Sequence, residues 1–436
     1  MTHADSRTGL VAYGVLALPL AMLALPVYVH IPKFYRDSFG LELGVLGALM
    51  LGTRCLDAVL DPWLGRMGDD ALARGKGRLW WIGLGTPFLM VGLLGLFNPP
   101  SSLSSPLALI WLGVCSLVVY VALSTVQINY QAHGAEIAHT PEARTRITAW
   151  REAFALAGVL LGASLPAVLM RSMDEASAFS HMSLVVICLL VVTAIVTRVG
   201  APHPVAVRDS GHAGAPQARE RLSAPLANRR FKRLACVFLC NGTAAAIPST
   251  LVLFYIQDVI GRADLTAQFL LAYFAAGALG MPVWPWLARR LGKIRAWQLS
   301  MAGALLVFFW AGTLGPGDVT AFLIVCGLSG LALGGDLALP PALLADLLQD
   351  GPEAPGSEAG ASYFGWWNLL SKMSLGLAAG LALPLAQWLG YVPGSSSPSG
   401  EGVQGLLICY AFLPCGVKLG AILLLQGLSM AERPGD

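Results

Sequence analysis

The chain has 436 residues, of which 56% are hydrophobic and 12% are charged, and its mean hydropathy is +0.66. Soluble domains contain roughly 25% charged residues and less than half apolar ones, because their exterior must be polar. The composition therefore excludes an ordinary soluble enzyme or secreted domain and indicates a helical integral membrane protein. The net charge of +3, with no basic domain, gives no reason to expect a nucleic-acid partner.

Apolar segments follow one another along the chain, and each is long enough to cross about 30 Å of hydrocarbon as a helix. We predict twelve membrane spans, near residues 10–32, 42–65, 79–98, 106–130, 148–170, 179–198, 234–256, 265–287, 297–314, 319–344, 362–390 and 404–428. One long connection, rich in Pro, Ala, His and Arg, separates the sixth span from the seventh. The prediction is an all-α membrane protein with six-helix bundles at 1–200 and 233–436 and a cytoplasmic linker at 201–232.

Lysine and arginine are distributed unequally between the two sides of the predicted spans. With the N-terminus in the cytoplasm, the cytoplasmic connections and tails carry twenty of these residues, and the outer connections carry four. Because positive charge favours the cytoplasmic side, both termini are predicted to lie in the cytoplasm, with the chain in the cell (inner or plasma) membrane. All eight cysteines fall within apolar segments, so no disulfide framework is expected.

The second predicted span carries two acids four residues apart, Asp57 and Asp61. Their side chains share one helix face about 5–6 Å apart. Two ionised carboxylates so close in low dielectric repel each other, so one must be protonated or a cation must bind beside them. The spacing favours a site for Na⁺ or a transferred proton. The alternative is structural: Arg54 neutralises Asp57, and Asp61 only precedes a kink at Pro62.

Other charges point to gating or to structural pairing. After the second span, Gly65-x-x-x-Asp69 is followed by basic residues that include Arg74. This pattern resembles a cytoplasmic loop signature of the major facilitator superfamily, and it predicts a carboxylate that binds basic residues or a neighbouring helix N-terminus. In the tenth span, Asp336 either pairs with a lysine, Lys372 or Lys418, or titrates during transport.

Three segments together resemble the glycoside–pentoside–hexuronide:cation symporter family, to which melibiose permease belongs. They are Asp57-x-x-x-Asp61-Pro62-x-x-Gly65-x-x-x-Asp69; Gly134-Ala135-Glu136 with Arg144-Thr145-Arg146 and Trp150-Arg151-Glu152; and Ser362-Tyr363-Phe364-Gly365-Trp366-Trp367 with Lys372. The resemblance covers nearly the whole chain outside the linker. It implies the major facilitator fold, with a central site reached alternately from each side of the membrane.

The resemblance also implies roles for individual residues. Asp57 and Asp61 match the cation-site carboxylates, and Ser124 matches a hydroxyl of that site. The implied substrate-site residues are Arg151, Trp367, Asn368 and Lys372.

Three positions depart from the family pattern. Ala21 stands where the family has a first-helix aspartate that binds sugar hydroxyls. Gln127 and Gln131 stand where the fourth helix has an aspartate and a sugar-stacking tryptophan. Gln127 then supplies a neutral oxygen to the ion.

We predict cation-coupled symport of a small sugar- or glycoside-like solute, with Na⁺ or H⁺ as coupling ion and no other cofactor or metal. An alternative on the same fold is a carrier of an amphipathic or lysolipid-like substrate, or a proton-coupled exporter. An enzyme is not expected, since H-E-x-x-H, G-x-S-x-G and a His/Asp cluster are absent from the sequence. The expected partners are the small-molecule substrate and membrane lipid, with the protein a monomer.

Overall fold

The computed structural model describes residues 7–24, 26–202, 222–350, 354–391 and 400–431. Within these ranges the regular secondary structure is helical, with no strand. The chain forms two compact units: Met1–Pro225 with Leu348–Leu369, and Leu226–Leu347 with Leu370–Asp436. Residues 348–369 therefore pack with the first unit, although they come from the second half of the sequence.

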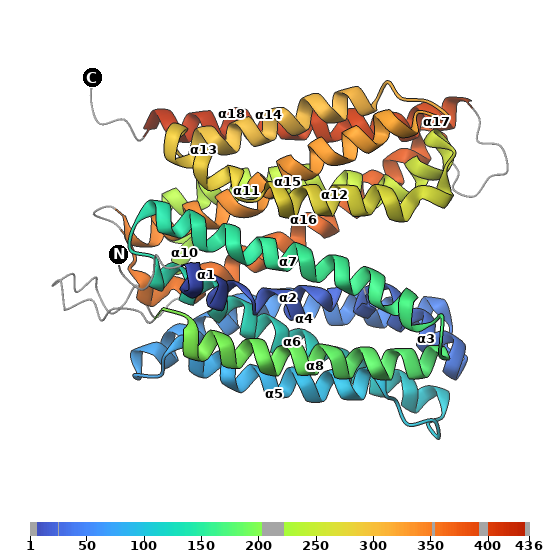
Figure 1. Cartoon of the computed structure of the whole chain (residues 1–436), viewed down its shortest axis with the longest axis horizontal. Helices are drawn as coiled ribbons and strands as arrows, with labels where there is room; N and C mark the ends of the chain where they lie inside the picture. Colours follow the sequence, from blue (N-terminus) through green and yellow to red (C-terminus); the bar gives the residue numbers. More distant parts are fainter. Residues whose placement is uncertain (1–6, 25, 203–221, 351–353, 392–399, 432–436) are drawn as a thin grey trace. The chain divides into compact units, whose positions relative to one another are not determined.

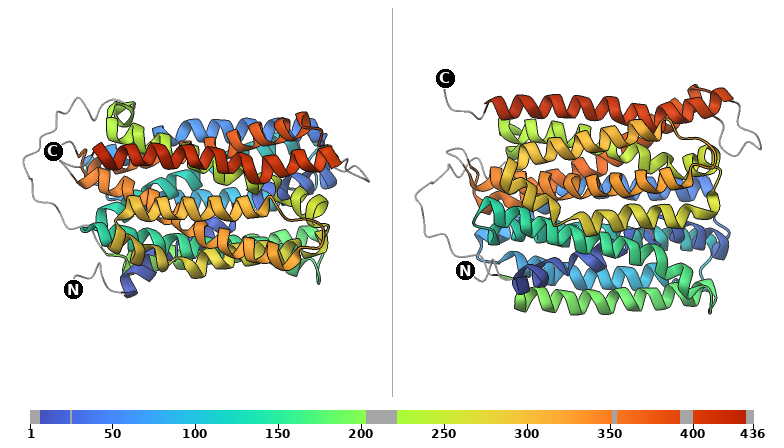
Figure 2. Two further views of the ribbon diagram at one scale, coloured as in Figure 1. Left: turned by 90° about the horizontal axis from the view of Figure 1, so that it is seen from above. Right: turned by 45° about the horizontal axis from the view of Figure 1, so that its top comes forward.

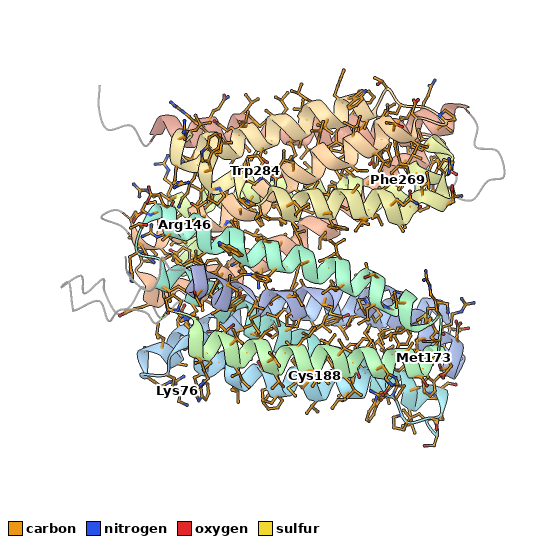
Figure 3. The ribbon with its side chains drawn as sticks, viewed as in Figure 1. Lys76, Arg146, Met173, Cys188, Phe269 and Trp284 are labelled. Atoms are coloured by element: carbon orange, nitrogen blue, oxygen red, sulfur yellow. The ribbon has the colours of Figure 1, made fainter. Side chains whose placement is uncertain are left out.

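The first unit is a bundle of long helices. Its helices are α1 (Arg7–Gly14), α2 (Ala17–Met22), α3 (Ile31–Phe39), α4 (Leu43–Ala73), α5 (Arg78–Phe97), α6 (Ser105–Ile137), α7 (Pro141–Leu169) and α8 (Glu175–Gly200). Helix α6 packs against α4 and α5, α8 runs along α5, and α2 packs against α7 (Figure 1). At one end of this unit lie Lys76 and Arg146, and Met173 lies at the other (Figure 3).

The first predicted span is interrupted. It consists of α1, α2, a π-helical turn at Pro26–His30 and α3. Prolines at 19, 26 and 32 explain the interruption, because proline has no backbone N–H to continue the hydrogen-bond ladder. Helix α1 is held against α6 by two hydrogen bonds: the Tyr13 hydroxyl donates to the Tyr130 carbonyl at 2.9 Å, and the Tyr130 hydroxyl donates to the Tyr13 carbonyl at 2.5 Å.

The second unit is built in the same way. The remaining helices are α10 (Ala224–Ala227), α11 (Arg229–Tyr255), α12 (Thr266–Gly280), α13 (Val283–Leu291), α14 (Lys293–Ala311), α15 (Val319–Gln349), α16 (Gly360–Trp388), α17 (Gly400–Leu407) and α18 (Leu413–Ala431). Of these, α10 is short, and α16 is shared between the two units. Helices α11 and α14 pack against α18 (Figure 2). In its core, the Tyr255 and Tyr410 rings stack with centroids 4.0 Å apart.

Nine helical segments among the described residues are long and apolar enough to cross a membrane: α5, α6, α8, α11, α12, α14, α15, α16 and the α17–α18 segment. The other predicted spans are the interrupted first one, α4 and α7. Helix α4 contains Arg54, Asp57 and Asp61, and α7 contains Arg151 and Glu152. Each of the twelve predicted regions coincides with one helix or with consecutive helices, so the predicted all-α membrane fold is confirmed.

Candidate functional site

Asp57 and Asp61 lie on the buried face of α4 in the first unit, with exposed fractions of 3% and 0%. Helix α4 continues past Pro62 without a break, so the four-residue spacing keeps both carboxylates on one side. Leu56 and Val59, which point in other directions, are exposed. The pattern of α4 is therefore the reverse of that of a helix in a soluble protein. Its apolar side chains face outward, as a lipid environment requires, and its acids face the interior of the bundle.

Helix α6 brings a hydroxyl to the first of these acids. The Ser124 hydroxyl donates to Asp57 Oδ1 at 2.9 Å, and Ser124 is buried. Gln127 lies three residues further along α6 and is half-buried. Carboxylate, hydroxyl and amide oxygens are the ligands that hard cations prefer. Among the described residues, no group of three or more His, Cys, Asp and Glu side chains is placed to hold a metal ion.

The first part of α16 lies directly against α4. A Cβ atom added to Gly365 would lie 2.5 Å from the Asp61 carbonyl oxygen, and one added to Gly65 would lie 2.2 Å from the Ala361 carbonyl oxygen. Glycine at both positions allows the two backbones to touch. Two and three residues after Gly365, α16 carries the buried side chains of Trp367 and Asn368.

This close approach predicts that Gly65→Ala destabilises the protein by about 1–3 kcal/mol, because a new methyl group in a packed contact forces the helices apart. The measurement is the free energy of unfolding in a detergent–SDS titration. Gly52→Ala is the matched control, since a Cβ at Gly52, on the same helix, would meet nothing within 4 Å. Equal stability of the two variants would contradict the prediction.

The other residues of the predicted substrate site are distributed between the units. Arg151 is 6% exposed on α7, and its guanidinium bonds the adjacent Glu152 Oε1 through Nη2 at 2.6 Å and Nε at 3.0 Å. Arg151, Trp367 and Asn368 belong to the first unit, whereas the half-buried Lys372 belongs to the second. Arg54 is exposed on α4, unlike the buried Asp57.

Asp69, near the end of α4, binds the N-terminus of α16. Its Oδ1 accepts the Ala361 N–H at 3.0 Å, and its Oδ2 accepts the Ser362 N–H at 2.7 Å. The first N–H groups of a helix have no partner within the helix and carry partial positive charge, so a carboxylate there is stabilising. The predicted meeting of this acid with a helix N-terminus is present within the first unit.

Arg78 completes the contact. Its Nη2 lies 2.7 Å from Asp69 Oδ1, and its Nε lies 2.8 Å from Glu136 Oε1 at the end of α6. The Arg78 side chain is fully buried. We call Asp69, Arg78, Glu136 and the N–H groups of Ala361 and Ser362 the Asp69 network.

Arg74, the basic residue after the motif that we predicted to take part, is exposed after the end of α4. The structure therefore assigns the cationic position of the Asp69 network to Arg78. In the sequence, Arg78 directly precedes the predicted third span and Glu136 follows the predicted fourth, so both are charges next to a span.

A second set of contacts within the first unit involves the end of α15. Arg144, near the start of α7, is buried and bonds Asp350 Oδ2 at 2.6 Å and Gln349 Oε1 at 2.7 Å. The Gln349 amide also donates to the Ala135 carbonyl. The connection between α15 and α16 is thus bound to the ends of α6 and α7, so both ends of this connection are fixed on the first unit.

The second unit contains its own buried charge cluster, formed by four helices. Lys418 on α18 lies 2.7 Å from Asp336 Oδ2 on α15 and 2.8 Å from Asn241 Oδ1 on α11. The indole N–H of Trp297, on α14, donates to Asp336 Oδ1 at 3.0 Å. Of the two lysines considered for Asp336, Lys418 is the partner. We call these four residues the Lys418 cluster.

A protein-family model described as MFS/sugar transport protein matches residues 10–431. The chain belongs to this family. It is accordingly a multi-pass membrane protein of the MFS/sugar transport family, as the motifs on α4, α7 and α16 predicted.

Curated relatives of this MFS/sugar transport family member are distant. The inner membrane symporter YicJ of Escherichia coli is 24% identical over 262 residues, 58% of this chain and 55% of the relative, so that match spans little more than half of either protein. The isoprimeverose transporter of Lactiplantibacillus pentosus is 22% identical over 92% of this chain and 84% of its own length. The putative glycoside/cation symporter YagG of Escherichia coli is 26% identical over 90% and 85%.

A solved structure shares the fold. The outward-facing crystal structure of a bacterial homologue of the iron transporter ferroportin matches with a TM-score of 0.69 and 16% identity, covering 97% of this chain and 99% of that chain.

Proposed function

We propose that the chain is a secondary active transporter that couples the movement of a sugar- or glycoside-like solute to that of a cation. The observation that carries the proposal is the buried Asp57–Asp61 pair with its Ser124 hydroxyl, in a chain that matches the MFS/sugar transport family over residues 10–431. Buried intramembrane carboxylates are unfavourable unless they bind a proton or cation, so selection for a bound ion explains their presence. The names of relatives such as the isoprimeverose transporter support a sugar-like solute.

In this mechanism Asp57 and Asp61 hold Na⁺ or H⁺, and Ser124 and Gln127 supply neutral oxygens. Arg151, Trp367, Asn368 and Lys372 contact the solute. The ion and the solute bind one facing state more tightly than the other, and this difference in affinity drives the conformational cycle. Because the family description names sugar transport, we do not favour an amphipathic or lysolipid-like cargo or a proton-coupled exporter.

The cycle consists of movement of the bundle 1–200 against the bundle 233–436, joined by the linker 201–232. The Asp69 network stabilises the state in which residues 348–369 are bound to the first unit. The connections that carry the basic residues face the cytoplasm in this proposal, as do both termini, and the protein works as a monomer in the cell membrane.

Uptake into proteoliposomes tests the proposal. The probes are radiolabelled isoprimeverose and methyl β-D-glucoside, with an inward Na⁺ gradient, an inward H⁺ gradient or neither. We expect gradient-driven uptake by the wild type and its loss in Asp57→Asn and Asp61→Asn, because an amide cannot carry the charge that binds the ion.

The control for these variants is Asp70→Asn, an exposed acid on the same helix that lies 3.9 Å from Arg66. It is expected to transport normally. Gradient-driven uptake that persists in both buried-acid variants would contradict the proposed coupling role of the Asp57–Asp61 pair. Wild-type uptake that does not depend on either gradient would contradict the proposal of symport.

A further inference from the structure

Three arginines at the corner between α13 and α14 are exposed and have no acidic partner among the residues that the structure describes. Arg289 and Arg290 close α13, and Arg295 lies in the first turn of α14. All three are exposed, and no acidic side chain in the described part of the chain forms an ion pair with them. The nearby Lys293 differs, because its Nζ lies 2.7 Å and 2.5 Å from the Asp346 carboxylate oxygens. Within the described ranges, the corner therefore carries three positive charges that no acidic side chain neutralises.

A similar sequence in the first unit has its arginine paired with acids. The sequence between α4 and the first residue of α5 reads Gly75-Lys76-Gly77-Arg78, and a similar sequence, Gly292-Lys293-Ile294-Arg295, joins α13 to the first turn of α14. Gly75 and Gly292 have similar left-handed φ angles of 79° and 81°. Arg78 is buried between two acids of the Asp69 network, whereas Arg295 is exposed. The same Gly-Lys-x-Arg sequence thus ends in an arginine that is satisfied internally in the first unit and exposed in the second.

The exposed face of α13 changes character along its length. Val283 and Trp286 are 42% and 47% exposed, and the guanidinium of Arg290 lies 5.0 Å from the centre of the Trp286 ring. These three residues share one helix face at positions i, i+3 and i+7. The order apolar, aromatic, basic is that of a helix passing from hydrocarbon through the interface to the lipid headgroups.

The opposite face of α13 fixes this arrangement in place. Trp284, Pro285 and Ala288 are buried, and the Trp284 indole donates to the Leu331 carbonyl on α15 at 3.0 Å. Because α13 is anchored by this face, Trp286, Arg289 and Arg290 are held on its outward side.

We propose that this corner, Arg289, Arg290 and Arg295 with Trp286, binds the phosphate groups of anionic phospholipids. Three guanidinium groups supply charge-assisted hydrogen bonds to phosphate oxygens. The adjoining Val283 and Trp286 side chains contact the acyl chains, which a free phosphate ion does not have. The site is independent of ion coupling at Asp57 and Asp61, so it goes beyond the proposed transport function.

The test is the thermal midpoint of the full chain in nanodiscs of POPC and in nanodiscs in which a quarter of the lipid is POPG. A ligand that binds the folded state stabilises it by mass action, so POPG is expected to raise the midpoint of the wild type. The rise should be lost in Arg289→Gln/Arg290→Gln/Arg295→Gln, since each arginine contributes about fivefold in affinity for an anionic surface. Inorganic phosphate at millimolar concentration should produce no rise.

Two further triple variants control for net charge and for charge type. Arg36→Gln/Arg171→Gln/Arg262→Gln removes the same number of exposed arginines elsewhere and should keep the POPG-dependent rise. Replacing the three corner arginines by lysine retains the charge and should keep most of the POPG-dependent rise in the thermal midpoint. The proposal is overturned if the corner glutamine variant keeps the full rise, if the control loses it equally, or if phosphate alone reproduces it.

Discussion

Arg78→Met is expected to lower the free energy of unfolding by about 3–5 kcal/mol, because removing one partner of a buried ion pair leaves the other charges without compensation. Arg78 is fully buried, and its partners Asp69 and Glu136 have side chains only 13% and 6% exposed. Asp69 would keep its two N–H donors from α16, but Glu136 would lose its cation. A detergent–SDS unfolding titration measures the effect.

Arg66→Met is the matched control for Arg78→Met. Arg66 lies at the same end of α4, is 38% exposed and approaches Asp70 only to 3.9 Å. Exposed pairs contribute about 0–1 kcal/mol, so this variant should unfold like the wild type. Adding Glu136→Gln to Arg78→Met should recover part of the lost stability, because one uncompensated charge is removed. An Arg78→Met protein as stable as the Arg66→Met protein would show that the buried network contributes nothing.

The second large effect is expected in the other unit. Lys418→Met should lower the free energy of unfolding by about 3–5 kcal/mol, since it leaves the Asp336 side chain, which is only 10% exposed, with the Trp297 N–H but without its cation. The double variant Lys418→Met/Asp336→Asn should regain most of this loss, because the asparagine is neutral and still accepts the indole N–H. The same unfolding titration measures both variants.

Lys232→Met serves as the control for Lys418→Met, because Lys232 is an exposed lysine on α11 in the same unit. Its replacement should change stability by no more than about 0.5 kcal/mol. If the double variant were as unstable as Lys418→Met alone, the loss would come from packing of the lysine stem rather than from the charge left on Asp336.

The sequence was sufficient to predict the helical architecture. Long apolar segments identify membrane helices, and recognising them requires no information on which helices pack together. It was less informative for α4 and α7, whose charges at 54–61 and 151–152 dilute the apolar signal. The interruption of the first span follows from its prolines, but whether a proline kinks a helix or divides it depends on which neighbours satisfy the freed backbone groups.

The site was predictable where residues share a helix and less so where they meet across helices. The spacing of Asp57 and Asp61 already placed them together, and the family resemblance brought Ser124 to the same site. The choice between Arg74 and Arg78 for Asp69 required the ends of α4 and α5, because Arg74 ends one helix facing outward while Arg78 begins the next facing inward. The sequence offered two lysines as partners of Asp336, and only the packing of α18 against α15 identifies Lys418 as the partner.

The sharing of α16 between the units has a consequence for biosynthesis. The first two hundred residues leave the ribosome well before residues 348–369, which later supply the N–H groups for Asp69 and the acceptors for Arg144. In a nascent N-terminal half, Asp69 therefore lacks its N–H donors and Arg144 lacks its two acceptors until the end of α15 and the start of α16 are made. A fragment ending at residue 225 should for this reason be a poor folding unit, and co-expression with the remaining fragment should restore it.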